Sequence, residues 1–467
     1  MQPNLRTISL LLGPLLFIGV SARMPLGLDL QQSRILGLSL WMLLWWFTEV
    51  IPLGATALLP LVVLPATGLA TEADLAKAYG DKMIFLFLGG FFLAEMLEKT
   101  ELHKRLALSI LDKTGTSSRA ILGGFMLTTF FLSLWISNTA TAVMMLPLAL
   151  SVLQTTQSSS DSASQLLSER LLLGIAFSAS IGGIGTLIGT PPNLVYAGFV
   201  EKMTGNGPTF AGWFFLAFPT ALVLGVAAFL LLSRGLSRNT SLSKDFAKSA
   251  LDEMGPTSIA QQRALLLFGA TVSLWIFRVP LVEFTGWTWL SDTIVALIGG
   301  LLAFIIPSVP CGPPLLEWHD TRKIPWGILL LFGGGLALAT GLENSGLTSL
   351  FTQSVSKDWP LWTMILASTI AGVWLTEFLS NMALVTAFMP VLWSLSQAFG
   401  IPFEVIGLPL TLGASCAFML PMATPPNAIV VSSGHVTVRA MAKQGFYLNL
   451  FSTIWIFLVC YAYALAK

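Results

Sequence analysis

Residues 131–150 read FLSLWISNTATAVMMLPLAL, and the polar triplet Ser137-Asn138-Thr139 lies near the centre of this stretch. The surrounding segment from Ala120 to Leu153 carries no charged residue. Each apolar arm beside the triplet is too short to span a bilayer comfortably. An Asn in such a place therefore predicts a re-entrant hairpin whose polar tip lies deep in the membrane.

The same arrangement occurs again in the second half of the chain. Ser380-Asn381-Met382 repeats the triplet, with Met in the place of the Thr, and it also lies between two apolar runs. A proline follows the Asn by nine positions in both copies, at Pro147 and Pro390. The sequence thus predicts two hairpins of the same kind.

Composition indicates an integral membrane protein. Of the 467 residues, 55% are hydrophobic and only 10% are charged, which is typical of a chain that crosses a bilayer many times. The formal net charge of +1 gives no reason to expect a nucleic-acid partner. The chain has no Walker motif, no Ser-His-Asp order and no metal-ligand spacing, so we expect a protein that is not an enzyme.

The apolar runs are continuous, so helices are the expected spanning elements. We predict an all-α polytopic fold with eleven transmembrane helices plus the two hairpins. The expected spans are 5–20, 35–48, 53–65, 83–96, 171–200, 213–232, 264–279, 293–306, 326–342, 405–433 and 446–465.

A Ser- and Lys-rich segment divides the chain into two similar halves. We predict a first transmembrane helix at 1–32, a first repeat at 33–233, a cytoplasmic linker at 234–262 and a second repeat at 263–467. Each repeat contains a hairpin, at 119–155 and 360–398, and a broken helix, at 171–200 and 405–433. Since each half has an odd number of spans, the second copy enters the membrane with opposite topology, and the repeats are inverted.

The broken helices are predicted from two matching elements, Gly189-Thr190-Pro191-Pro192-Asn193 and Ala423-Thr424-Pro425-Pro426-Asn427. A double proline removes two backbone donors and prevents the preceding residue from continuing a helix. Free carbonyls and a new helix N-terminus result at the middle of each span. Carbonyls suit a bare cation and a helix N-terminus suits an anion. A simple proline kink is the alternative for either copy alone.

Lysine and arginine predict the orientation. Three basic regions fall on one side of the membrane in this span count, and the positive-inside rule makes that side cytoplasmic. The N-terminus is then cytoplasmic and the C-terminus outside. The residues used are Lys99, Lys104, Arg105, Lys113, Arg119, Arg234, Arg238, Lys244, Lys248, Arg439 and Lys443, with Arg170, Lys357 and Glu404 flanking the hairpins.

The tips and breaks contain no Lys or Arg, so a bound dianion there lacks a fixed counter-charge. Two helix N-termini offer roughly half a charge each, and bound cations can supply the rest. Neutral hydroxyl, amide and carbonyl oxygens suit Na+. Glu377 is the exception: it is either a proton carrier or a structural hydrogen-bond acceptor, and the sequence leaves both open.

The paired SNT-like triplets and TPPN breaks, in inverted halves, resemble the divalent anion sodium symporter family, which includes the INDY-like sodium/dicarboxylate transporters. The resemblance covers nearly the whole chain. It implies a homodimer that works by an elevator mechanism, with a scaffold domain and a transport domain. It also implies Na+ as the co-transported ion, with at least two sites.

By the family pattern, two groups of residues form the binding sites. The expected Na+ ligands are Ser133, Ser137, Asn138 and Gly189 in the first site, and Thr376, Leu379, Asn381 and Ala423 in the second. The expected substrate contacts are Ser137, Asn138, Thr139, Thr190, Ser380, Asn381, Met382, Thr424 and Pro425. Met382 departs from the pattern, because its side chain cannot donate a hydrogen bond.

We therefore expect a multi-pass protein of the cell inner (plasma) membrane that couples Na+ to the uptake of di- or tricarboxylates such as succinate, malate, fumarate or citrate. The alternatives within transport are a Na+-independent dicarboxylate exchanger and a carrier of an inorganic dianion such as sulfate. A channel or a membrane sensor that uses the same cavity is the alternative of a different class.

Overall fold

A computed structural model describes residues 3–154, 162–236, 245–347 and 359–466. The described residues form helices and no strand. Arg238, Lys244 and Lys357, which entered the orientation argument, lie outside them. The first half contains α1 (Pro3–Arg23), η1 (Pro25–Gly27), α2 (Leu30–Thr48), α3 (Leu53–Thr56), α4 (Leu59–Thr67), α5 (Glu72–Tyr79), α6 (Lys82–Lys99), α7 (Leu102–Asp112), α8 (Ser118–Ser133), α9 (Asn138–Gln154), α10 (Ser162–Ile184), α11 (Pro191–Thr204) and α12 (Phe210–Leu232).

The rest of the described chain is likewise helical. It contains α13 (Asp245–Met254), α14 (Ile259–Thr285), α15 (Asp292–Ile305), the 3-10 helix η2 (Trp318–Lys323), α16 (Trp326–Asn344), α18 (Leu361–Ile370), the π-helical turn η3 (Ala371–Leu375), α19 (Asn381–Phe399), α20 (Glu404–Ala414), α21 (Pro425–Ser432) and α22 (Val438–Ala466).

Both hairpins are helical pairs, and in each the Asn of the triplet is the first residue of the second helix. In the first, α8 begins after Ser117, whose hydroxyl accepts a hydrogen bond from the Ala120 amide, and α9 begins at Asn138. These helices have 16 and 17 residues. At 1.5 Å per residue they are about 24 to 26 Å long, which is less than the hydrocarbon core of a bilayer. In the second, α18 and η3 lead to the tip and α19 begins at Asn381.

Both predicted broken helices are interrupted just before their double proline. The first stops at Ile184 and resumes at Pro191, and the second stops at Ala414 and resumes at Pro425. The prolines occupy the first two positions of the new helix, where a backbone N–H has no intrahelical partner in any case.

The half-helices of one repeat pack against the half-helices of the other. α10 packs against α21, and α11 packs against α20. The rings of Phe177 on α10 and Phe418, which precedes α21, have centroids 5.2 Å apart. On the other side, Tyr196 and Phe199 of α11 contact Phe403 just before α20, at 6.1 and 5.3 Å. Each broken helix therefore packs against the broken helix of the other repeat.

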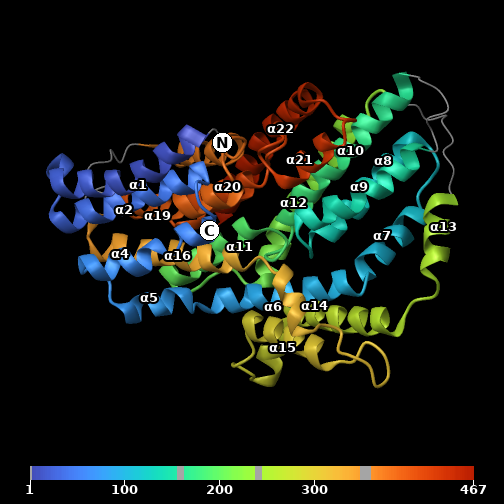
Figure 1. Cartoon of the computed structure of the whole chain (residues 1–467), viewed down its shortest axis with the longest axis horizontal. Helices are drawn as coiled ribbons and strands as arrows, with labels where there is room; N and C mark the ends of the chain where they lie inside the picture. Colours follow the sequence, from blue (N-terminus) through green and yellow to red (C-terminus); the bar gives the residue numbers. More distant parts are fainter. Residues whose placement is uncertain (1–2, 155–161, 237–244, 348–358, 467) are drawn as a thin grey trace.

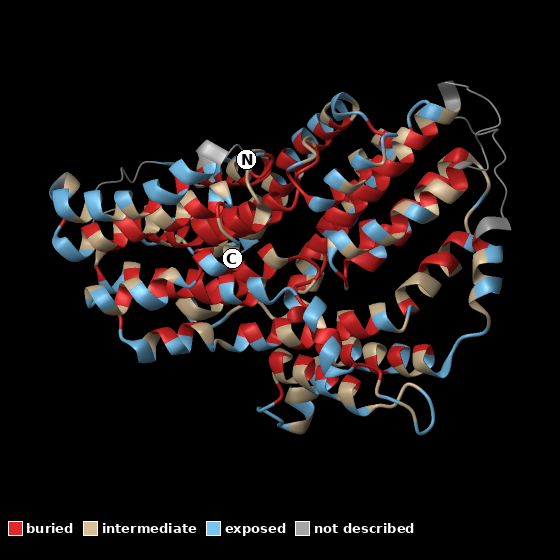
Figure 2. Ribbon diagram, viewed as in Figure 1, coloured by how far each residue is buried: buried red, intermediate tan, exposed pale blue. Residues whose placement is uncertain are grey.

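Burial separates a central helix from the periphery. In α10, 89% of the residues in its apolar window are buried, against 11% in α1 and 17% in α14. Figure 2 shows the same contrast, with buried residues concentrated along the middle of the molecule. Seven described helices are long and apolar enough to cross a membrane, and six shorter apolar helices accompany them. These helices make the chain a multi-pass membrane protein.

The linker between the halves contains a helix that the composition did not indicate. α13 packs against α7, another short helix, which lies between α6 and the first hairpin, at one end of the molecule in Figure 1. Arg105 of α7 holds the junction: its guanidinium donates to Gly255 O at 2.7 Å and to Gln261 Oε1 at 2.7 Å. The linker is thus tied to the first half as well as connecting the two.

Candidate functional site at the hairpin tips and helix breaks

Each hairpin tip forms a three-oxygen cluster with the helix that follows it. Ser133 Oγ lies 2.7 Å from Asn138 Oδ1 and 2.6 Å from Ala179 O. Thr376 Oγ1 lies 2.6 Å from Asn381 Oδ1 and 2.9 Å from Ala414 O. In both halves a hydroxyl five residues before the Asn joins the tip to α10 or α20 by the same geometry.

These clusters contain more acceptors than hydrogens. A hydroxyl carries one hydrogen and can donate to only one of its two neighbours. With the amides oriented as they are, the remaining oxygen of each cluster faces another oxygen with no hydrogen between them. Ser180 and Ser415, which directly follow Ala179 and Ala414, add buried hydroxyl oxygens without a partner among the described residues. Neutral oxygens in surplus are what a bare cation needs, so the residues present fit Na+.

The first break is held against the first tip by Thr186. Its hydroxyl donates to Leu134 O at 2.5 Å and accepts from the Gly189 amide at 3.0 Å. A Cβ at Gly189 would come within 2.6 Å of Gly183 O, so only glycine allows the chain to pass this close. Thr190, in an extended conformation at the N-cap of α11, is 3% exposed.

The second break is held by a carboxylate instead. Glu377 is 2% exposed and follows Thr376 directly. Its Oε1 accepts from the Phe418 and Met419 amides at 2.7 and 2.9 Å, and its Oε2 accepts from the Leu420 amide at 3.0 Å. Leu134 occupies the matching position in the first half. The two halves therefore fix their breaks by different chemistry.

Four helices have their positive ends at the hairpin tips and helix breaks. α9 and α19 begin at the tips, and α11 and α21 begin at the breaks, and each N-terminus favours negative charge. Thr424, the N-cap of α21, is 5% exposed, and its hydroxyl accepts from the Asn427 amide at 3.4 Å. The tips and breaks thus combine neutral oxygens of the kind that suits a cation with helix ends that favour an anion.

The predicted site residues differ in exposure. Ser137, Thr139 and Pro425 are exposed, and Asn138, Leu379, Ser380 and Asn381 are partly buried. The buried ones are Ser133, Gly189, Thr190, Thr376, Met382, Ala423 and Thr424. The structure brings Ser133 to Asn138 and Thr376 to Asn381 by direct contact. No hydrogen bond between the two tips is present among the described residues.

Several residues at the site were not predicted. Thr186 and the carbonyls of Ala179 and Ala414 have no local signal, because their role depends on contacts across dozens of residues. Asn193 and Asn427 close the quoted TPPN elements, so a signal existed for them. Each side chain is fully buried. Their hydrogen bonds reach back across the breaks, as described below.

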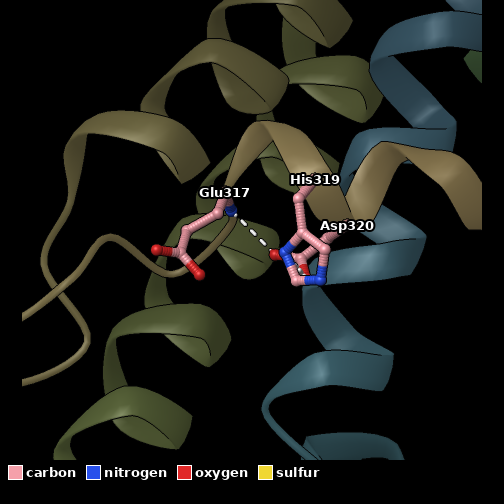
Figure 3. A group of neighbouring side chains, drawn as sticks. All are labelled: Glu317, His319 and Asp320. Atoms are coloured by element: carbon pink, nitrogen blue, oxygen red, sulfur yellow. Dashed lines mark hydrogen bonds and ion pairs between the residues drawn. The ribbon is translucent and has the colours of Figure 1, made fainter.

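A cluster of Glu317, His319 and Asp320 at η2 has side chains close enough to share an ion (Figure 3). The side chain of Lys99 already supplies a positive charge there, because its Nζ lies 2.6 Å from Asp320 Oδ2 and 3.3 Å from Glu317 Oε2. Burial raises the pKa of Asp320, but the bonds from Lys99 and from the Glu317 amide outweigh it, so this pKa lies below its ordinary value. The cluster is an ion pair that fixes η2 to the end of α6.

Comparison with known proteins agrees with the predicted resemblance. The model of the family described as "Sodium:sulfate symporter transmembrane region" matches residues 6–466. The sodium-dependent dicarboxylate transporter SdcS of Staphylococcus saprophyticus is 36% identical over 472 residues, which cover 97% of this chain and 90% of the relative. SdcS of Staphylococcus aureus strain NCTC 8325 is 37% identical over 474 residues, with the same coverage.

A solved structure supports the fold. The YdaH transporter of Alcanivorax borkumensis superposes with a TM-score of 0.57, covers 90% of this chain and 97% of its own, and is 14% identical. At this identity the likeness concerns the fold alone. The match of the family model over almost the entire chain decides the family: this protein belongs to the divalent anion sodium symporters and is a transporter, not an enzyme.

Proposed function

We propose that the chain is a secondary active symporter that carries a di- or tricarboxylate together with Na+ across the cell inner (plasma) membrane. One observation carries the proposal most: two matching clusters of neutral oxygens, at Ser133–Asn138 and Thr376–Asn381, each with a surplus of acceptors. The relatives named above as sodium-dependent dicarboxylate transporters support both the ion and the substrate class.

The two cation sites would use the tips and the breaks together. The first takes oxygens from Ser133, Ser137, Asn138 and the backbone at Gly189. The second takes oxygens from Thr376, Asn381 and the backbone at Leu379 and Ala423. Since no Lys or Arg occupies the tips or breaks, Na+ in these sites would offset the charge of the bound anion. The anion would then bind well only when Na+ is present, which is what coupling requires.

The substrate carboxylates would lie between the two tips and the starts of α11 and α21. Helix N-termini and hydroxyls bind carboxylates without a fixed positive charge. The contacts proposed are Ser137, Asn138, Thr139 and Thr190 on one side, and Ser380, Asn381, Met382, Thr424 and Pro425 on the other. Succinate, malate and fumarate fit such a two-ended site, and citrate would add a third carboxylate.

We further propose an elevator mechanism in a homodimer. The hairpins and broken helices pack on one another and would move as one body against α1–α6 and α14–α16. Where α11 meets α6 and α16, polar and apolar contacts occur together: Lys82 pairs with Glu201, Lys202 donates to Leu336 O and Thr340 Oγ1, and Gly198 lies against the ring of Phe332. The proposed orientation keeps the N-terminus cytoplasmic and the C-terminus outside.

Uptake into proteoliposomes tests the proposal. Labelled succinate, citrate and sulfate are offered in turn, with an inward gradient of Na+ or of choline. Accumulation of succinate driven only by Na+ is the expected result. Accumulation without a Na+ gradient would favour the exchanger, and loss of exchange between labelled and unlabelled substrate would favour a channel.

A second candidate has one observation in its favour, because the description of the matching family model names sulfate. Sulfate is a compact dianion, whereas succinate carries its charges at two ends. An excess of unlabelled sulfate should leave succinate uptake unchanged if the two-ended site is correct. Na+-driven sulfate uptake that exceeds succinate uptake would replace the carboxylate proposal with this one.

A further inference from the structure

Asn193 and Asn427 make the same backbone hydrogen bonds in the two halves. Asn193 Nδ2 donates to Gly183 O at 3.0 Å and to Thr186 O at 2.8 Å, with Ile184 O at 3.3 Å. Asn427 Nδ2 donates to Ala417 O and Leu420 O, both at 3.0 Å. In each half the bonded carbonyls lie ten and seven residues before the Asn. In each half, one side-chain amide therefore joins the start of the second half-helix to the loop before it.

These carbonyls have no helical partner of their own. Gly183 and Ile184 end α10, where the last carbonyls of a helix are unpaired. Ala417 and Leu420 lie in the loop after α20, where Leu420 O also accepts from the Ala423 amide at 3.2 Å. Gly183 and Ala417 are buried, so their carbonyls need a donor from within the protein. The Asn side chain supplies two N–H groups and thereby fixes the direction of both carbonyls.

In the first half, the tied peptide touches two proposed cation ligands. A Cβ built at Gly183 would lie 2.5 Å from Asn138 Oδ1, and a Cβ at Gly189 would lie 2.6 Å from Gly183 O. Gly183 is thus packed between the first hairpin tip and the break. The hydrogen bond from Asn193 to Gly183 O therefore fixes the residue that packs against both Asn138 and Gly189.

In the second half, the tied peptide is held from both sides. Leu420 O accepts from Asn427, while the Leu420 amide donates to Glu377 Oε2 at 3.0 Å. Glu377 is bonded in sequence to Thr376, whose hydroxyl contacts Asn381. A shift of the Leu420 peptide would therefore move the second cluster.

The acceptor of each amide is left over. Asn193 Oδ1 and Asn427 Oδ1 are buried and have no partner among the described residues. An unpaired buried acceptor costs stability, so packing alone does not explain an Asn at these positions. What the two repeats share is the use of both N–H groups of the Asn side chain to bind backbone carbonyls.

We propose that Asn193 and Asn427 are positioning residues, each of which holds one cation site in shape by tying together the carbonyls of its break. The inference rests on the proposed function. A rigid oxygen frame distinguishes ions by size, because it cannot contract around a smaller one. Loosening one frame should therefore weaken Na+ binding and reduce the preference for Na+ over Li+ at that site.

The test compares Asn193→Ser and Asn427→Ser with the wild type. Serine keeps one donor where Asn has two. It therefore cannot make both hydrogen bonds to the carbonyls, but it can still make one. Asn206→Ala is the control, because Asn206 is exposed in the loop after α11. Binding is read without transport, from the rise in apparent Tm of the purified protein with increasing Na+ or Li+, which reports affinity by mass action.

Each Ser variant should need on the order of tenfold more Na+ for the same rise in Tm, equivalent to about 1.4 kcal/mol. Each should also show a smaller difference between Na+ and Li+, while Asn206→Ala behaves as wild type. Folded Ser variants with wild-type Na+ response and ion preference would overturn the inference, and so would a lower Tm with unchanged ion response. If the Ser variants do not fold, Asn193→Gln and Asn427→Gln decide: a wild-type ion response in both overturns it.

The outcome separates this inference from the proposed function. If the wild type shows no Na+-dependent uptake and no rise in Tm with Na+, the proposed function fails and the inference fails with it. If the wild type responds to Na+ and the folded Ser variants respond equally, only the inference fails.

Discussion

Asn449 Nδ2 donates a 2.7 Å hydrogen bond to Glu377 Oε1, which joins α22 to the second hairpin. Together with the amides of Phe418, Met419 and Leu420, it gives the Glu377 side chain four N–H donors. A carboxylate that only accepts matches this environment. The arrangement favours the structural role of Glu377 over that of a proton carrier, because a proton on the carboxyl group would add a fifth donor where four N–H groups already point at it.

Glu377→Gln should lower stability and activity without changing the pH profile of Na+-driven uptake. The Gln amide would point an N–H₂ group at backbone N–H groups, and each donor left unpaired costs about 1 to 3 kcal/mol. Thermal unfolding and uptake across a pH series measure both effects. Glu283→Gln, at an exposed site on α14, is the control. A pH dependence that is lost in Glu377→Gln would make Glu377 a proton carrier.

Asn138→Ala and Asn381→Ala should each abolish transport while the protein stays folded. Each amide oxygen is proposed to contact a cation, and each amide also lies beside a hydroxyl on the same tip. Uptake is measured in proteoliposomes, and folding is checked by gel filtration and thermal unfolding. Wild-type uptake by either variant would remove that Asn from the site.

Na+ and substrate should strengthen each other's binding. Without a basic residue in the tips or breaks, the cation is the available counter-charge, and linkage makes the effect reciprocal. Calorimetry of succinate binding in Na+ and in choline buffers measures the effect in one direction, and Na+ titration with and without succinate measures it in the other. Equal succinate affinity in the two buffers would contradict sodium coupling.

The features that the sequence predicts well are those with local causes. Pro191 and Pro192 cannot continue a helix, so the break before them follows from backbone chemistry alone. The Asn138 and Asn381 tips follow from a polar residue inside an apolar run. The amphipathic helix α13 was missed because its chain is polar and Ser-rich, and its support comes from Arg105 of α7, far away in sequence.

The features that the sequence could not predict depend on contacts between residues far apart in the chain. Whether Glu377 is structural depends on Asn449, 72 residues away, and on three loop amides whose positions no pattern reveals. The same holds for Asn193, whose bonds depend on how the loop before it folds back. The exposure of a side chain is also set by the assembled fold: Thr139 is exposed, whereas Met382, at the matching position, is buried.

The last prediction concerns Met382, where the second triplet departs from the first. Met382 is 8% exposed and belongs to the buried apolar core, although Ser380 and Asn381 beside it are only partly buried. A hydroxyl at this position would supply a hydrogen bond to a carboxylate that Met cannot make. A hydrogen bond to a charged group is worth about 1.5 to 3 kcal/mol, or on the order of tenfold to a hundredfold in affinity.

Met382→Thr should therefore tighten dicarboxylate binding or shift the preference among succinate, malate and citrate. If Met382 only packs within the hairpin, Thr would leave a small cavity and lower the Tm with no change in selectivity. Competition of the three acids against labelled succinate, in the wild type and the variant, distinguishes the two. Met382→Leu is the matched control, because it stays apolar and cannot donate. An unchanged rank order with unchanged affinity ratios in Met382→Thr would mean that this side chain does not face the substrate.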